Sequence, residues 1–324
     1  MNKDLYVLKF HPILKEKVWG GNKLKKVLNK NSKTDKTGES WEISDVEGDL
    51  SVVSDGPLAG KTLKSLIGEY KGDLVGEKVY KEHNTKFPLL IKFIDAAEAL
   101  SIQLHPNDEV AQKRHNSFGK TEMWYIMQAD EDAEIILGFK EAVTKSEYQA
   151  LVEKGGLAEA LNTEKSKPGD AYFIKAGLVH AIGAGILLAE IQQNSDITYR
   201  IYDWDRVSNT GEQRELHTQE ALDCINLDNN KDFLVNYKLE ENQKNALVHD
   251  TYFKTDILKV NGEFARNYEK LDSFVILMGV EGDSVIEYDE KSIDLGYGES
   301  LLIPACINKI NVLGKNSKIL EVSV

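Results

Sequence analysis

Short runs of apolar residues, separated by turn residues, dominate the pattern of this chain and predict strands more often than helices. Glycine and aspartate mark many of the turns. Strands and helices do not alternate regularly, which argues against a doubly wound parallel sheet. The pattern instead favours antiparallel strands closed into a barrel or folded into a sandwich, so we predict a mainly β fold. The predicted strands span residues 89–94, 123–127, 135–137, 171–174, 186–191, 275–278, 284–288, 301–303 and 319–322.

Helical features are confined to a few segments. Apolar residues at helical spacing predict short helices packed on a sheet over residues 60–85. Thr144 and Glu147 form a capping-box pattern ahead of a helix that Gly155 ends, and another helix is expected to start near Thr218. The chain contains no glycine-rich phosphate-binding loop of the Gly-x-Gly-x-x-Gly or Walker type.

The length of 324 residues exceeds what a single core usually covers, so we predict two domains. The polar, turn-rich segment 227–243 is the candidate boundary region. Residues 298–305 repeat the pattern of residues 169–176, which indicates a weak internal repeat of one barrel unit. We therefore predict a catalytic domain with small helical insertions over residues 1–235 and a second domain over residues 236–324.

Composition and charge narrow the class of function. An apolar content of 41% and a charged content of 29% are typical of a soluble globular protein. The net charge of −13 and the pI near 5.1 argue against nucleic acid as a partner, because that binding needs Lys and Arg to neutralise phosphates. A local group of cations can still bind one small anion, whatever the net charge.

No segment predicts membrane insertion or export. Residues 1–5 begin a strand-like pattern without an apolar signal core, and the longest apolar run, residues 181–189, is too short to span a membrane. The two cysteines, Cys224 and Cys306, are too few for a disulfide framework or a cysteine-based zinc site. We therefore expect a cytoplasmic protein.

Four polar residues in apolar, strand-like sequence form a candidate metal site. Gln103 and His105, two residues apart, point to the same face of a strand. Glu122 follows after enough residues for a loop and a return strand, and His180 is expected at the end of a strand-like run entered through residues 168–170. Each residue alone is more often hydrogen-bonded or exposed to solvent. Together they can bind one divalent metal inside a barrel, which would offset the cost of burying them.

Several short motifs occur together in this chain, and their combination is more specific than any one of them. They are Phe10-His11-Pro12, Val18-Trp19-Gly20-Gly21, Gly38-Glu39-Ser40-Trp41-Glu42, Gln103-x-His105-Pro106, Lys120-x-Glu122 and Gln193-Asn194-Ser195-Asp196-Ile197-Thr198-Tyr199-Arg200. In these motifs the chain resembles the type I mannose-6-phosphate isomerases, in their short bacterial form with two cupin units. The resemblance covers most of the chain, but the carboxy-terminal unit carries no diagnostic motif.

The resemblance implies a mainly β fold of two cupin-type, jelly-roll barrels, with a few helices inserted in or packed on the first. It also implies one zinc ion (Zn2+) per chain, held by the four candidate ligands, and an active-site role for Arg200. Extending the internal repeat places Lys309 opposite His180, so the second unit is expected to lack a metal and to be structural. The implied partner is a small-molecule sugar phosphate, bound by a monomer or a weak homo-oligomer.

The implied reaction interconverts mannose 6-phosphate and fructose 6-phosphate by moving a proton between C1 and C2 through an enediolate. Zinc would act as a Lewis acid for the developing negative charge. The resemblance makes Glu190 and Lys120 candidates for the base, and the sequence does not distinguish between them. Arg200 is expected to stabilise the enediolate or to bind phosphate. From the residues alone, a structural salt bridge of Arg200 with Asp203 or Asp205 is the other interpretation.

Two other functions fit the same residues. One is an iron-dependent oxygenase of the same fold, although such enzymes usually have more than two histidine ligands. Metal analysis combined with a test for oxygen consumption would identify it. The other is a non-catalytic sugar-binding protein, for which Arg200 and Glu190 would be dispensable for ligand affinity and a zinc ion would have no purpose.

Overall fold

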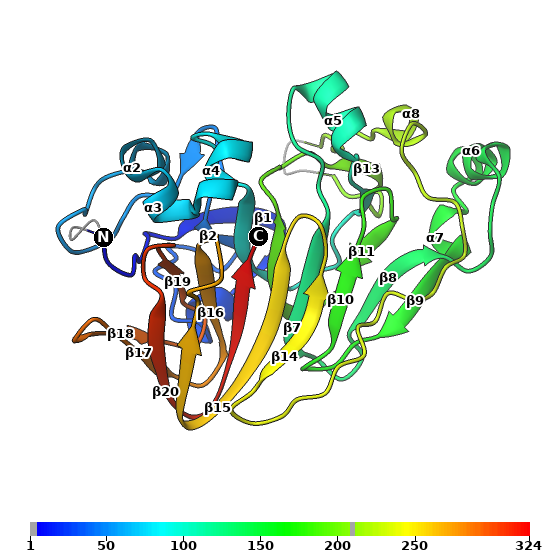
Figure 1. Cartoon of the computed structure of the whole chain (residues 1–324). Coiled ribbons are helices and arrows are strands. Elements are labelled where there is room, and N and C mark those ends of the chain that lie inside the picture. Colours follow the sequence, from blue (N-terminus) through cyan, green and yellow to red (C-terminus); the bar gives the residue numbers. More distant parts are fainter. Residues whose placement is uncertain (1–4, 208–210) are drawn as a thin grey trace.

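The computed structural model describes residues 5–207 and 211–324. Residues 1–4, where the predicted amino-terminal strand pattern begins, lie outside the described residues. The described chain is mainly β with few helices, as the sequence predicted, and its strands form three large sheets (Figure 1). Within it, no helix is long and apolar enough to cross a membrane.

The first sheet has six antiparallel strands, and its inner strands β5 (Leu89–Ala96) and β12 (Ile186–Gln193) are buried on both faces. Its strand order is β1 (Ile13–Gly21), β2 (Thr37–Ile43), β5, β12, β7 (Glu122–Ala129) and β10 (Ala171–Ile174). One face packs on the second sheet through residues such as Ile94 and Trp124, and the other contributes Ile91 and Leu187 to a core shared with the third sheet. Because both faces are buried, β5 and β12 consist of nearly continuous apolar runs.

The second sheet has five strands and faces the first. Its order is β13 (Tyr199–Tyr202), β6 (Ile102–Leu104), β11 (His180–Ile182), β8 (Glu134–Phe139) and β9 (Leu161–Lys165). Leu137 and Ile182 pack toward the first sheet, whereas Phe139 and Tyr148 belong to a core on the outer side. That outer core includes residues of α6 (Lys145–Lys154), α7 (Leu157–Ala160) and α8 (Thr218–Ala221).

The third sheet contains the carboxy-terminal strands and encloses a core of its own. Its order is β14 (Lys244–His249), β15 (Lys254–Asn267), β20 (Lys309–Ser323), β16 (Val275–Glu281) and β19 (Ser300–Ile303), with β17 (Ser284–Tyr288) pairing with β20 and β18 (Lys291–Leu295). Lys309 begins β20 as His180 begins β11, so the order of the strands agrees with the predicted repeat. Lys309 is exposed and pairs with Glu269 at 2.8 Å.

The helices follow the predicted signals in part. The segment 60–85 forms α2 (Leu63–Tyr70), α3 (Gly72–Val75) and α4 (Glu77–His83), and the remaining small elements are α1 (Lys23–Lys26), β3 (Asp45–Val46) and β4 (Asp49–Leu50). The capping box of Thr144 and Glu147 is present, and Gly155 ends α6 as predicted. The helix predicted near Thr218 is a single turn. The sequence did not predict α5 (Asp108–His115), because Ala111 is its one buried residue and no apolar stripe marks it.

One site residue lies in a different element from the one expected. His180 was predicted at the end of the run entered through residues 168–170. Instead β10 ends at Ile174, Gly177 turns the chain with φ of +87°, and His180 begins β11 in the opposite sheet. The candidate boundary segment 227–243 forms turns and isolated bridges, and it contains no strand of more than one residue. The division of the chain at residue 235 into two domains stays a prediction.

A largely buried ion pair in the third sheet, between Arg266 and Glu321, is expected to contribute to stability. Arg266 donates two hydrogen bonds to Glu321, at 2.9 and 2.7 Å, and Tyr268 Oη donates a third at 2.7 Å. Glu321→Gln removes the counter-charge of Arg266 inside the fold, so we expect the free energy of unfolding to fall by roughly 2–3 kcal/mol. Urea unfolding followed by fluorescence measures this change.

The control for this test is Glu269→Gln. Its ion pair with Lys309 is exposed to solvent on both sides, and such pairs contribute little. We expect the unfolding midpoint of this variant to stay at the wild-type value. Equal midpoints for the Glu321→Gln and Glu269→Gln proteins would show that the buried pair adds no stability.

Candidate metal centre and active-site cavity

Three strands of the second sheet place Arg200, Gln103 and His180 side by side. Arg200 on β13 pairs with Gln103 on β6, and Gln103 pairs with His180 on β11. Residues paired across antiparallel strands have neighbouring side chains on one face. The strand register therefore brings together three predicted site residues that are far apart in the sequence.

The facing sheet carries a second row of polar and aromatic residues. Trp41 on β2 pairs with Lys92 on β5, Lys92 with Glu190 on β12, and Glu190 with Trp124 on β7. Lys92 Nζ donates to Glu190 Oε1 at 2.9 Å, and Trp124 Nε1 donates to Glu190 Oε2 at 3.0 Å. Glu122 precedes Trp124 by two residues on β7, so its side chain is on the same face.

His105, Glu122 and His180 meet between the two sheets. Their potential ligand atoms all lie within 4.8 Å of one another, and each residue is 1% exposed. His105 Nε2 is 3.5 Å from Glu122 Oε2, and His180 Nε2 is 3.6 Å from Glu122 Oε1. Among the described residues, this is the one group of three His, Cys, Asp or Glu residues close enough to share a metal ion.

Hydrogen bonds to the outer ring nitrogens turn the Nε2 atoms of both histidines toward the centre of the cluster, where Lys120 Nζ contacts that of His105. His105 Nδ1 lies 2.9 Å from the carbonyl oxygen of Ile197, and His180 Nδ1 lies 2.9 Å from that of Leu178. An imidazole that donates through Nδ1 presents the lone pair of Nε2, as metal binding requires. Glu122 Oε1 is buried without a hydrogen-bond partner. The residues therefore fit a metal ion, which would satisfy all three acceptors.

Burial also sets the charge of these groups. Burial and the nearby charge of Lys120 lower the pKa of His180 to about 4 and hold the pKa of His105 well below its usual range. Burial, reinforced by the charge of Glu190, raises the pKa of Glu122 to about 7. The histidines are thus in the neutral form that binds metals, and an added cation would favour the ionised form of Glu122.

Gln103 lies next to the cluster and connects it to Arg200. Its Nε2 is 3.4 Å from His180 Nε2, and its Oε1 accepts a hydrogen bond from Ser101 Oγ at 3.2 Å. Rotation of the amide by 180° would turn its oxygen toward the cluster as a fourth ligand. Arg200 Nε donates to Ser101 Oγ at 3.3 Å. A chain of hydrogen bonds therefore connects Arg200 to the candidate ligands.

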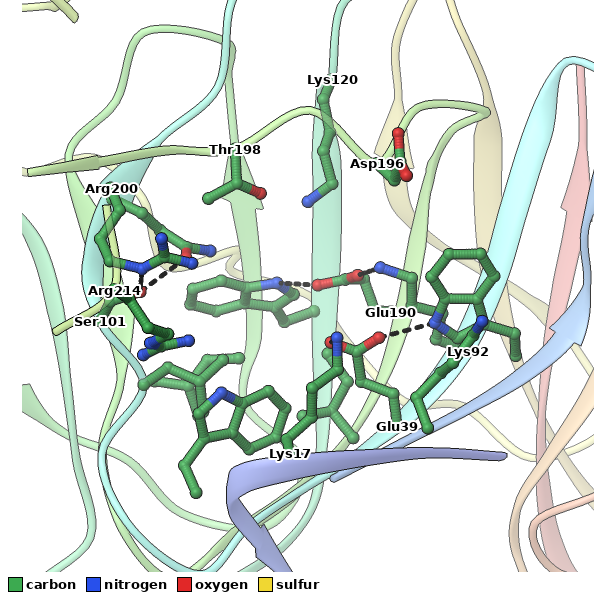
Figure 2. A pocket seen from close by; sticks show the side chains of 18 of the residues that line it. Lys17, Glu39, Lys92, Ser101, Lys120, Glu190, Asp196, Thr198, Arg200 and Arg214 are labelled. Carbon is green, nitrogen blue, oxygen red and sulfur yellow. Dashed lines mark hydrogen bonds and ion pairs between the residues drawn. The ribbon is translucent and has the colours of Figure 1, made fainter. Parts of the chain in front are cut away.

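The ammonium group of Lys120 reaches the same cluster. Lys120 is 4% exposed, its Nζ is 2.9 Å from His105 Nε2, and it also donates to Glu122 Oε2. In Figure 2 the side chain of Lys120 extends from the top of the view toward Glu190, and Lys17 lies below Glu190. The structure thus brings both candidate bases, Lys120 and Glu190, into the same region.

A cavity of about 420 Å³ adjoins the candidate ligands, and its walls include Gln103, Lys120, Glu190 and Arg200 (Figure 2). This volume suits a small ligand. Cations outnumber acids on its walls, which suits an anionic ligand despite the acidic composition of the whole chain. The cations are Lys15, Lys17, Lys92, Lys120, Arg200 and Arg214, and the acids are Glu39, Asp49, Glu190 and Asp196.

Glu190 behaves differently from Glu122, although both carboxylates are buried. Burial tends to raise the pKa of Glu190, but the charges of Lys92 and Lys120 outweigh this effect and lower it to about 2. Both oxygens of Glu190 also accept hydrogen bonds. Glu190 is therefore ionised and fixed in place, and it is a weak proton acceptor near neutral pH.

Arg200 does not form the structural salt bridge that the residues alone left open. Its NH1 group donates to the carbonyl oxygen of Glu215 at 3.0 Å. Asp203 pairs with other arginines, among them Arg214 at 2.5 Å, and Asp205 accepts a hydrogen bond from a tyrosine hydroxyl. The guanidinium of Arg200 is left to hydrogen bonds with neutral groups at the wall of the cavity.

Several residues of the cavity were not predicted as site residues. Lys92 had a recognisable signal, because a lysine inside the apolar run Leu89–Ala96 is costly to bury without a partner. Glu39 was noted only as part of a motif, and it lies in the cavity wall with Lys17, its ion-pair partner at 3.1 Å. Arg214 had no signal, because a turn-rich segment brings it to the cavity.

The matches to known proteins agree with this geometry. Residues 7–151 match the model of the phosphomannose isomerase type I catalytic domain, and residues 242–323 match that of the mannose-6-phosphate isomerase cupin domain. The chain is 35% identical over 311 residues to the mannose-6-phosphate isomerase ManA of Bacillus subtilis (strain 168), with 94% of this chain and 95% of the relative covered. The chain belongs to the type I mannose-6-phosphate isomerase family.

Two further matches cover nearly the whole chain. The mannose-6-phosphate isomerase of Streptococcus mutans is 32% identical over 293 residues, with 90% of both chains covered. A crystal structure of a Bacillus subtilis mannose 6-phosphate isomerase superposes with a TM-score of 0.89 at 33% identity, covering 99% of this chain and 100% of that one. The predicted family, the enzyme class and the mainly β cupin fold are thereby confirmed.

The pKa of Glu122 predicts how metal binding depends on pH. Below about pH 7 the carboxyl group is protonated and must lose that proton to bind a metal. His180 stays neutral down to about pH 4, and the pKa of His105 also lies well below its usual range. We expect the dissociation constant for Zn2+ to be constant above pH 7 and to rise about tenfold per pH unit below it. Competition with a chromophoric chelator between pH 5.5 and pH 8 measures this.

The control for this measurement is His180→Ala, which should fold normally but bind no stoichiometric zinc, because one of three converging ligands is gone. A dependence of two protons per zinc between pH 5.5 and pH 6.5 would contradict the expectation. Because Glu122 accounts for one of the protons, the second would show that at least one histidine titrates near its ordinary pKa and is not held neutral by burial.

Proposed function

We propose that this protein is a zinc-dependent aldose-ketose isomerase that interconverts mannose 6-phosphate and fructose 6-phosphate. The observation that carries the proposal is that a buried His-Glu-His cluster, Lys120 and Arg200 adjoin one cavity rich in cations, in a chain of the type I mannose-6-phosphate isomerase family. Binding of a sugar phosphate requires cationic groups that bind its negative charge. An isomerase also requires a group next to C1 and C2 that carries the proton between them.

The metal would be held by Gln103, His105, Glu122 and His180. Two imidazoles, one carboxylate and one amide oxygen suit zinc and leave the site with a net charge of about +1. When bound, zinc would supply Lewis-acid stabilisation of the negative charge that develops on the substrate oxygens. Two neutral Nε2 atoms and the unpartnered Glu122 Oε1 support this ligand set.

Of the two candidate bases, we favour Lys120, whose amine in its neutral form would take the proton from one of the carbons C1 and C2 and return it to the other. Its Nζ lies at the candidate ligands and its side chain lines the cavity. Glu190 has both oxygens engaged by Lys92 and Trp124, and its lowered pKa makes it a weak acceptor. Glu190 then orients Lys92 and adds negative charge that stabilises the cations around it.

Arg200 is placed to stabilise the enediolate. It pairs in register with Gln103, and its hydrogen bond to Ser101 connects it to the metal ligands. A guanidinium held by neutral groups keeps its charge for the substrate, and this is worth more in a cavity from which water is excluded. The phosphate would then be bound by cations farther along the wall, such as Lys17 and Arg214.

The physiological setting that we propose is the cytoplasm, with the protein acting as a monomer or a weak homo-oligomer on a small soluble substrate. Cys224 and Cys306 are both free, as expected of a chain that works in a reducing compartment.

A coupled assay tests the proposed function directly. Purified protein should convert mannose 6-phosphate to fructose 6-phosphate, should lose this activity on treatment with a chelator, and should regain it with Zn2+. Activity should depend on Zn2+ because the metal ion would stabilise the negative charge of the enediolate. Full activity of protein shown by metal analysis to be free of bound metal would overturn the zinc assignment, and no activity at all would overturn the isomerase.

The Arg200→Ala variant tests the role of the guanidinium. Loss of an electrostatic donor that acts on the transition state should lower kcat by about two orders of magnitude or more, with zinc content unchanged. Arg200→Lys should recover little, because an ammonium lacks the planar fork of donors. A loss confined to KM would instead assign Arg200 to phosphate binding. Wild-type kcat and KM would exclude both roles.

Parallel substitutions distinguish the two candidate bases. Lys120→Gln should lower kcat by roughly 10²-fold or more, because the proton carrier is gone. It should also abolish exchange of the substrate C2 proton with solvent deuterium, which is read by NMR. Glu190→Gln keeps the shape of the side chain and should retain exchange. If Glu190→Gln stops exchange and Lys120→Gln does not, Glu190 is the base.

A further inference from the structure

The carboxylate of Asp108 accepts hydrogen bonds from three separate parts of the chain. Asp108 is the first residue of α5 and follows the candidate ligand His105 by three residues. Its Oδ1 accepts from Gly119 N at 2.8 Å and from Gln193 Nε2 at 3.0 Å, and its Oδ2 accepts from Tyr252 Oη at 2.6 Å. None of these contacts belongs to the cavity described above.

These hydrogen bonds fix the backbone on both sides of Lys120. Gly119 packs so closely that an added Cβ would lie 2.6 Å from Asp108 N, so no larger residue fits there. On the other side, Gln193 Oε1 accepts from Thr121 N at 2.9 Å, and Gln193 N donates to Thr121 O at 3.1 Å. The segment 119–121 is therefore held by Asp108 directly and by Gln193, which Asp108 itself holds.

Tyr252 connects this network to the carboxy-terminal sheet. It lies in the turn between β14 and β15, where the next residue, Phe253, is fully buried and packs edge-on against Phe173. Asp250 N donates to Phe253 O at 2.9 Å and closes the turn. Burial and the hydrogen bond to Asp108 raise the pKa of Tyr252 to about 12, so its hydroxyl remains a donor at neutral pH.

We propose that Tyr252, acting through Asp108, is a positioning residue that holds segment 119–121 and so keeps Lys120 and Glu122 in place at the metal site. Beyond the network, a second cavity of about 420 Å³ is lined by Asp108, Gln193 and Tyr252. Because this space adjoins the network, hydrogen bonds rather than close packing hold these side chains. A shift of about 1 Å in a ligand or a base is enough to weaken binding and catalysis.

The test compares Tyr252→Phe, which removes the hydroxyl alone, with the wild-type protein. We expect the dissociation constant for Zn2+ to rise about threefold to tenfold, the effect of one lost hydrogen bond behind the ligands. At saturating zinc, kcat on mannose 6-phosphate should fall by a similar factor while KM changes less than twofold. Introducing Tyr252→Phe into Asp108→Asn should add no further loss, because the two residues act as one unit.

Tyr237→Phe is the matched control. Tyr237 packs against the same apolar core as Tyr252, but its hydroxyl donates to Gly169 O at 2.6 Å. This variant should keep wild-type zinc affinity and kcat. Wild-type zinc affinity or wild-type kcat in Tyr252→Phe overturns the proposal, whatever its melting temperature, and so does an equal loss in Tyr237→Phe.

This inference rests on the proposed function, on zinc binding for its affinity part and on isomerase activity for its kinetic part. If the wild-type protein does not isomerise mannose 6-phosphate, the proposed function has failed. Zinc affinity alone then decides whether Tyr252 positions the segment that leads to Glu122.

Discussion

A carboxylate buried between two apolar sheets is the constraint on which the site depends. Glu122 is 1% exposed, and one of its oxygens has no hydrogen-bond partner. Placing such a charge in a protein interior costs several kcal/mol unless a cation compensates it. The fold concentrates that compensation in one place, with Lys120 in contact and two neutral imidazoles turned toward the carboxylate. The geometry of these groups would fit a divalent cation at this point.

The same interior holds Glu190 in the opposite electrostatic state. Lys92 and Trp124 hydrogen-bond both of its oxygens, so its ionised form is stabilised without a metal. Glu122, which lacks such partners on one oxygen, has its pKa raised instead. The environment, and not the residue type, therefore gives one carboxylate the properties of a ligand and the other those of a fixed counter-charge.

The carboxy-terminal sheet supports the site, although none of the candidate ligands lies in that sheet. It shares a core with the outer face of the first sheet and so buries the strands that carry Lys92, Glu122 and Glu190 on both sides. A shift of the register by one residue would turn Lys92, Glu122 and Glu190 into the apolar core on the other face of the sheet, which is costly. The third sheet packs on the other face of the first sheet and so fixes the position of the row of site residues that the first sheet carries.

The sequence by itself indicated the mainly β class, part of the strands and the set of candidate ligands. Runs such as Leu89–Ala96 are apolar because both faces are buried, and burial leaves a local record in composition. The motifs around Gln103, Glu122 and Arg200 were recognisable through their resemblance to those of the type I mannose-6-phosphate isomerases, and the placement of Gln103 and Glu122 in apolar sequence gave a separate signal. The helix α5 was not predicted, because its polar sequence has no buried stripe, although the cap by Asn107 is a local signal of its start.

Tertiary structure alone decided how these parts meet. The pairing of Arg200 with Gln103 and of Gln103 with His180 depends on hydrogen bonds between strands far apart in the chain, which no local pattern encodes. Non-local contacts also decide that the chain turns His180 into the opposite sheet, and they set the different surroundings of Lys120 and Glu190. Local sequence records whether a residue is buried. Which charges surround it there is set by non-local packing, and that determines its chemistry.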